Sequence, residues 1–190
     1  MIELVNKNQI NYGSIISFNK GEYIFRELDI CDKLYFIMEG EVIISSSDLM
    51  GNEDIFNHLY KGDVFGNNLL FSNHNSFLGD AKAIVNTQIL MYTKDAIMHI
   101  FLENPKFLEK FLSLNANATI SAKIKNKILA KRNIKERILF YLNINGGNIN
   151  ISINQLANEL ILNRVCVSRV ISELIEEGII KKEGKKIKII

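Results

Sequence analysis

SINQLANELILNRVCVSRVISELIEEG, residues 152–178, sets two short amphipathic segments side by side with only two or three residues between them. The apolar residues of the first segment share one helical face, and those of the second recur at i, i+3, i+4, i+7 and i+8 from Val167. Two helices joined so abruptly have to cross steeply. The stretch therefore predicts a helix-turn-helix.

The outward face of the second segment, residues 163–177, carries residue types that read DNA. At 100° per residue Val165 and Arg169 lie opposite the apolar stripe, and Arg164 projects from the first turn beside Asn163, the expected N-cap. The start of such a helix enters the major groove, where Arg donates two hydrogen bonds to guanine and an apolar side chain contacts the thymine methyl. We predict binding to double-stranded DNA; a merely solvated basic face is the alternative.

Positive charge is concentrated in the same half of the chain. Residues 1–103 carry 7 Lys and Arg against 14 Asp and Glu, a net charge of −7, whereas residues 104–190 carry 16 against 7, a net charge of +9. The terminal run EEGIIKKEGKKIKII, residues 176–190, gives two short β runs around Glu183 and Gly184. We expect a basic wing whose Lys181 and Lys182 follow the phosphate backbone.

Upstream, the pattern changes near residue 103. Over residues 14–93, short β-rich runs alternate with Gly, Asn and Asp turns at spacings of about ten residues, which is typical of an all-β sandwich or roll. The run at 106–131 then has no helix breaker and spans about 39 Å as a helix. We predict three domains: a β-roll at 1–103, a long helix at 104–131 and a DNA-binding domain at 132–190.

The long helix carries one apolar stripe that we expect to pair with a second copy of the chain, forming a homodimer. The predicted seam consists of Phe107, Phe111, Leu114 and Ala118. Packing of this stripe against the β-roll of the same chain is the alternative, and each partner can hold along a different part of the helix.

Composition favours a non-enzymatic protein without a cofactor or metal. The first residues lack a signal peptide and no apolar run reaches the roughly 18 residues that cross a bilayer, so we expect a cytoplasmic protein with no membrane contact. Cys31 and Cys166 are too few for a disulfide framework or an iron–sulfur cluster. A cupin-like β-roll metal enzyme or sensor fused to a helix-turn-helix is the alternative, but its clustered His and carboxylate ligands are missing.

The motifs KGEYIFRE (20–27), LYFIMEGEVII (34–44) and GDVFG (62–66), followed by the helix-turn-helix, resemble the Crp/Fnr family of bacterial transcription regulators. The resemblance covers nearly the whole chain. It implies an α+β protein with an N-terminal cyclic-nucleotide-binding-type β-roll, a long dimerisation helix and a C-terminal winged helix-turn-helix. It also implies a homodimer on an inverted-repeat DNA site, with RNA polymerase as a further partner.

The resemblance assigns roles to several residues of the DNA-binding module. Arg164 and Arg169 match the family arginines that contact guanine and the backbone, whereas Val165 stands where a glutamate often accepts from cytosine, so a different half-site is implied. Ile161 and Leu28 replace family glycines, and we expect local strain at both. The predicted DNA-binding residues are Ser152, Asn154, Asn163, Arg164, Val165, Ser168, Arg169, Lys181 and Lys182.

The loop at 62–83 aligns with the family's phosphate-binding cassette, yet the polar side chains that bind the nucleotide are missing. Asn67, Phe77 and Leu78 stand at the family's Glu, Arg and Ser positions, with Lys82 the one nearby cation. We predict no cyclic nucleotide and either a filled pocket or a site for an unknown, apolar effector. The degenerate pocket comprises Gly66, Asn67, Phe77, Leu78, Lys82, Ala122 and Lys123, the last two at the positions of an adenine-contacting Thr–Ser pair.

Overall fold

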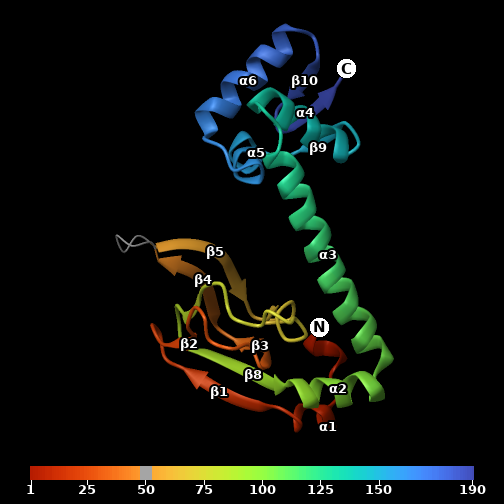
Figure 1. Ribbon diagram of the computed structural model, residues 1–190. Coiled ribbons are helices and arrows are strands. Elements are labelled where there is room, and N and C mark those ends of the chain that lie inside the picture. The colour runs from red at the N-terminus through yellow and green to blue at the C-terminus, as the bar shows by residue number, and fades with distance from the viewer. Residues whose placement is uncertain (48–52) are drawn as a thin grey trace. The chain divides into compact units, whose positions relative to one another are not determined.

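The structure is a computed structural model that describes residues 1–47 and 53–190 (Figure 1). The chain divides into two compact units, Met1–Ala116 and Asn117–Ile190. The division falls within one long helix, α3 (Pro105–Leu129). The three-domain boundaries at 103 and 131 stay a prediction.

The first unit is a β-roll of two four-stranded antiparallel sheets, as predicted. The sheets have the strand orders β1-β8-β3-β6 and β2-β7-β4-β5. Short helices flank them: η1 (Ile2–Leu4), α1 (Lys7–Ile10) and α2 (Lys94–Glu103). The strands are β1 (Ser14–Phe18), β2 (Tyr23–Phe25), β3 (Lys33–Glu39), β4 (Glu41–Ser47), β5 (Glu53–Tyr60), β6 (Val64–Phe65), β7 (Asp80–Ala83) and β8 (Thr87–Thr93).

Aromatic rings fill the core of the first unit, and two of them come from α3. Phe107 is fully buried, with its ring centroid 6.4 Å from that of Phe36, and Phe111 lies 5.1 Å from Phe101. The predicted dimer seam is therefore wrong at Phe107 and Phe111, because side chains enclosed by their own unit cannot contact a second copy. Leu114 is half-buried and Ala118 is exposed, so their role stays a prediction.

The second unit is a winged helix-turn-helix, again as predicted. Its core is built from side chains with no exposed surface, among them Ile138, Leu156, Val167 and Ile187. The three strands form an antiparallel sheet of order β10-β11-β9. Beyond α3 the elements are α4 (Ile134–Ile144), β9 (Asn148–Asn150), α5 (Ile153–Leu160), α6 (Arg164–Glu176), β10 (Ile180–Glu183) and β11 (Lys186–Ile189).

Two residues of the described chain carry backbone strain, and one of them lies in the turn between α5 and α6. Leu28 and Ile161 have φ angles of 70° and 55°, and no other non-glycine residue of the described chain has a positive φ. Ile161 is the C-cap of α5, and its amide donates to the carbonyls of Ala157 and Asn158. A β-branched residue in the left-handed region costs about 1–2 kcal/mol, and glycine is the usual occupant of such a cap. The strain expected from the two missing glycines is present.

Relief of this strain should stabilise the protein. Ile161 is 59% exposed, so its removal sacrifices little packing. We expect Ile161→Gly to raise the free energy of unfolding by about 0.5–1 kcal/mol, since the extra chain entropy of glycine offsets part of the relief. Urea unfolding measures the change. Ile161→Ala is the control, because alanine keeps a Cβ at the same φ; an equal gain in both variants would contradict the strain.

Candidate functional site

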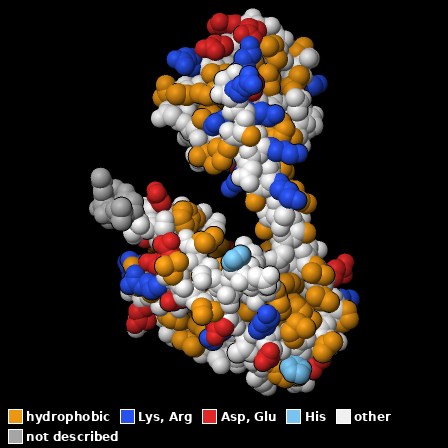
Figure 2. All heavy atoms as spheres, in the orientation of Figure 1, with side chains coloured by type: hydrophobic (Ala, Val, Ile, Leu, Met, Phe, Trp, Pro, Cys, Tyr) orange, Lys and Arg blue, Asp and Glu red, His pale blue; other side chains and the backbone are white. Residues whose placement is uncertain are grey.

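The exposed face of α6 is the main candidate surface. Val167, Val170 and Leu174 are buried, whereas Val165 is 73% exposed and the Arg169 side chain is 73% exposed. Arg164, Ser168 and Ser172 are exposed with them. The structure thus gives the predicted DNA-reading residues of α6 one solvent-facing surface, and Figure 2 shows Lys and Arg side chains spread over the visible face of this unit.

The ion pair that Arg169 forms is weak enough to leave its side chain available to another partner. Its Nε lies 3.7 Å from Glu173 Oε1, one helical turn away, and both side chains are more than half exposed. Such a surface pair contributes little to stability and is readily exchanged for another partner. Asn163 holds the start of the helix, since its Oδ1 accepts from the Val165 amide at 2.8 Å.

The start of α5 is fixed by a capping box. Ser152 Oγ accepts from the Gln155 amide at 3.2 Å, and Gln155 Oε1 accepts from the Ser152 amide at 2.9 Å. The Ser152 hydroxyl is therefore occupied in capping, while Asn154 in the first turn is exposed. A helix N-terminus attracts anions through its free amides, so this end remains suited to a phosphate.

The wing carries a set of lysines that sequence reasoning found only in part. In the register of β10 and β11, Lys181 faces Lys188 and Glu183 faces Lys186. These four side chains line a hollow of about 210 Å³ on one face of the sheet. Lys182 pairs with buried Ile187 and belongs to the opposite face. Period-two alternation of the β runs would have separated Lys182 from Lys181 and added Lys186 and Lys188.

One ion pair affects the charges of this wing. Lys181 Nζ lies 2.8 Å from Glu183 Oε1. This contact raises the pKa of Lys181 and lowers the pKa of Glu183, so both stay charged at neutral pH. The remaining lysines of the face keep a positive excess there.

The first unit contains a cavity of about 280 Å³ within the β-roll. Four residues assigned to the degenerate pocket line it: Gly66, Asn67, Phe77 and Leu78. No Lys, Arg, Asp or Glu lies in the lining, within residues 1–47 and 53–190. Ala122 and Lys123 are exposed side chains of α3 that belong to the second unit.

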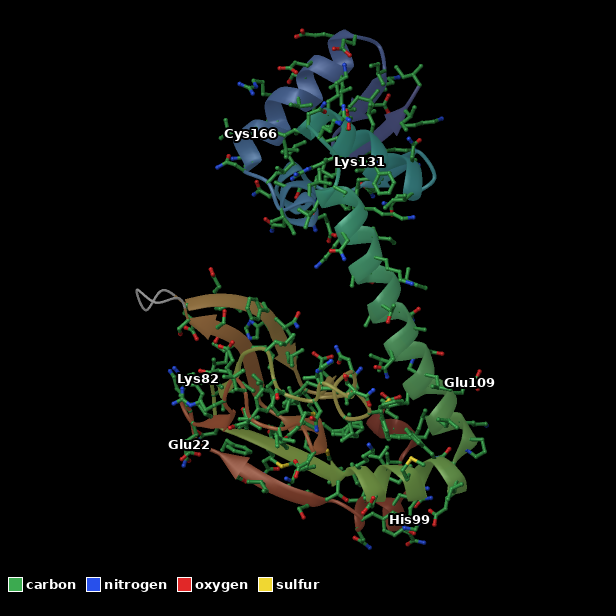
Figure 3. The ribbon with its side chains drawn as sticks, in the orientation of Figure 1. Glu22, Lys82, His99, Glu109, Lys131 and Cys166 are labelled. Atoms are coloured by element: carbon green, nitrogen blue, oxygen red, sulfur yellow. The ribbon has the colours of Figure 1, made fainter. Side chains whose placement is uncertain are left out.

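Lys82 is not part of the cavity lining. Its neighbours Ala81 and Ala83 are fully buried in the core, so alternation turns Lys82 to the other face of β7. There its Nζ lies 5.3 Å from the centre of the Tyr23 ring, on the outer surface of the roll (Figure 3). The one cation near the loop in sequence is therefore turned away from the cavity.

Phe77 stands at the loop position to which the resemblance assigns an arginine. It is 4% exposed and stacks on Phe25, with ring centroids 3.4 Å apart and planes 4° apart. Leu78 behaves differently, since it is 77% exposed and lies at the rim of the cavity instead of filling it. Asn67 is 7% exposed and donates from Nδ2 to Asn115 Oδ1 at 3.3 Å.

The cysteines and histidines form no further site in the described residues. No group of three or more His, Cys, Asp or Glu side chains stands close enough to hold a metal ion across residues 1–47 and 53–190. Cys31 is 1% exposed, and burial raises the pKa of its thiol to about 11. Cys166 lies in the first turn of α6 (Figure 3). None of the described helices is both long and apolar enough to span a membrane.

Comparison with known proteins gives the same architecture. Residues 15–104 match the cyclic nucleotide-binding domain family. A putative HTH-type transcriptional regulator, ycf28, of Porphyra purpurea is 27% identical over 185 residues, covering 91% of this chain and 76% of its own length. Electron transport regulator A of Shewanella oneidensis is 25% identical over 184 residues, covering 90% and 72%.

Solved structures share the fold over the whole chain. The catabolite activator protein of Thermus thermophilus superposes with a TM-score of 0.62 at 22% identity, covering 100% of this chain and 91% of its own. These findings agree on one architecture, in which a cyclic nucleotide-binding-type roll precedes a helix-turn-helix, and this chain shares it with proteins named as transcriptional regulators. The chain is similar in fold to regulators of the Crp/Fnr type.

The cavity should reject cyclic nucleotides. A cyclic phosphate keeps a full negative charge, and loss of its buried partner costs about 2–5 kcal/mol, or roughly 30- to 5,000-fold in affinity. We expect titration calorimetry with cyclic AMP and cyclic GMP to show no binding below about 1 mM, by the same reasoning. A micromolar dissociation constant that Lys82→Ala abolishes would contradict both the chemistry of the lining and the placement of Lys82.

Proposed function

We propose that the protein binds an inverted-repeat DNA site as a homodimer, with α6 of each copy in the major groove and half-site centres about one helical turn, roughly 34 Å, apart. One observation carries the proposal: Arg164, Val165 and Arg169 form an exposed surface on a helix whose other face is locked in a core. RNA polymerase is the further partner that such a regulator is expected to meet.

The exposed residues divide between reading bases and holding phosphates. Arg169 is suited to guanine, because its planar fork matches O6 and N7, and Val165 is suited to the methyl group of thymine. The wing lysines and the start of α5 are suited to phosphates, which position the protein but carry no sequence information. The hydroxyl of Ser152 is the weakest member, since it already caps its helix.

The homodimer is proposed to form through α3, on a face different from the one first predicted. Phe107 and Phe111 point into the core, and half-buried Leu114 lies on their side of the helix. Leu112 lies about 140° from Phe107 at 100° per residue and is 58% exposed. It is the large apolar side chain of α3 that the first unit leaves most open to solvent.

The DNA proposal is tested by pairing a base-reading variant with a phosphate-binding one. On a site selected from a random DNA pool, Arg169→Ala should cost about 1–3 kcal/mol and relax preference at one guanine. Lys188→Ala should weaken all sequences alike and reduce the salt slope by about 1. Fluorescence anisotropy at several salt concentrations measures both, with Lys61→Ala, an exposed lysine of the first unit, as the control. Unchanged sequence preference in Arg169→Ala would remove it from base reading.

The dimer proposal is tested by placing a charge on α3. Leu112→Glu should give a monomer in sedimentation at micromolar concentration, because two facing helices would bury unpaired carboxylates. Leu102→Glu on α2 is the matched control, since Leu102 is 79% exposed but lies off the long helix. A monomer from Leu114→Glu together with a dimer from Leu112→Glu would restore the face first predicted. A monomeric unmutated protein would refute both.

A further inference from the structure

The lining of the roll cavity has a consistent chemistry. Apart from three asparagines and two glycines it consists of Phe, Leu, Ile and Val side chains. Its volume of about 280 Å³ lies near the lower limit of ligand pockets, which suits a small molecule of up to three rings. A charged ligand would leave its charge unpaired there, whereas an apolar ligand would lose nothing on leaving water.

A β-bulge directs one aromatic side chain to the rim of this cavity. Ile44 pairs with Asn57 and Ser45 pairs with Ile55, which leaves Phe56 as an extra residue in β5. Bulges commonly re-aim a side chain beside a functional site. Phe56 thereby joins the lining instead of continuing the alternation of the strand.

Gly79 makes room for this arrangement. A Cβ built on Gly79 would lie 3.2 Å from Phe56 Cε2 and 2.6 Å from the carbonyl oxygen of Ser45. Only glycine therefore allows the Phe56 ring and the backbone of β4 to come this close. Phe56 is 55% exposed and its neighbour at the rim, Leu78, is 77% exposed. Two large apolar side chains are thus held in water at the entrance, where a bound molecule would cover them.

One buried polar side chain, that of Asn67, would orient a bound ligand. Asn67 uses Nδ2 to reach Asn115, and its Oδ1 receives no hydrogen bond from the described residues. This oxygen is not among the fully buried polar atoms that lack a partner, so solvent reaches it, and a ligand carrying a hydroxyl or an N–H group would donate to it in place of water. Asn67 therefore selects a hydrogen-bond donor on an otherwise apolar molecule.

We infer that this cavity is the effector site of the proposed regulator and binds a small, uncharged, mainly aromatic molecule with one hydroxyl or N–H donor. The inference rests on the proposed function, since an effector acts only on a regulator, but the experiment that tests it does not require DNA binding. The molecule lies against Phe56 and Leu78 at the rim and donates to Asn67 Oδ1. Carboxylates and phosphates are excluded because the lining provides no cation.

The probe for this site is N-phenyl-1-naphthylamine, an uncharged aromatic amine with one N–H that fluoresces in apolar surroundings. The chain contains no tryptophan, so its own emission interferes little. We expect saturable binding of one probe per chain in the absence of DNA. The double variant Phe56→Ala, Leu78→Ala should weaken binding by about 10-fold or more, because the probe loses its apolar contacts at the rim.

The matched control is Leu28→Ala, Ile55→Ala, which removes two side chains that are 74% and 59% exposed but do not line the cavity. It should leave binding unchanged. Equal weakening in both double variants, an unsaturable signal, or displacement of the probe by micromolar cyclic AMP would overturn the inference. Circular dichroism establishes that both variants are folded. Because no DNA is present, failure here leaves the DNA-binding proposal standing, and failure of DNA binding leaves this result standing.

The hydrogen bond has its own readout. The N-methylated probe lacks the donor and should bind the unmutated protein several-fold more weakly than the parent probe. In Asn67→Leu the two probes should bind alike, which a merely structural role of Asn67 would not produce. A preference for the parent probe that survives in Asn67→Leu would remove Asn67 from ligand recognition.

Discussion

The chemistry of the cavity in the first unit depends on the stacking of Phe77 on Phe25. At a centroid distance of 3.4 Å the two rings join the loop before β7 to β2, and Phe77 is also an edge-on neighbour of Tyr35 at 6.2 Å. Such contacts contribute beyond the burial of the rings alone. They place an aromatic ring where a nucleotide-binding roll needs a cation, so the interaction that stabilises the loop also removes the charged partner of a phosphate.

The features that the sequence predicted correctly are those that local rules determine. The helix-turn-helix follows from apolar periodicity and a connection too short for any other crossing, and the cap at Asn163 follows from side-chain chemistry. The strain at Leu28 and Ile161 was expected from the family resemblance instead, because the family carries glycine at both positions. For the helix-turn-helix and its cap, the determining residues lie within a few positions of one another.

The features that the sequence missed depend on what an apolar or charged face meets in space. Periodicity showed that Phe107 and Phe111 share one side of a helix, but the same stripe serves a second copy or the β-roll equally well. Leu78 follows Phe77 directly, yet one is exposed and the other buried, because neighbouring side chains of an extended chain point to opposite sides. The bulge at Phe56 is likewise set by pairing between strands and not by its own neighbours.

The bond between Asn67 and Asn115 limits how the cavity could influence the long helix. A ligand that donates to Asn67 Oδ1 polarises the amide and strengthens its donation to Asn115, which in turn donates to the carbonyl of Phe111 at 2.9 Å. Cooperative strengthening amounts to about 10–30% of a bond worth about 1 kcal/mol, or a few tenths of a kcal/mol. A shift from 1:99 to 99:1 between two states needs about 5.5 kcal/mol. Most of the response of a ligand-controlled regulator would therefore have to come from apolar contacts at the rim, where Phe56 and Leu78 offer the larger area.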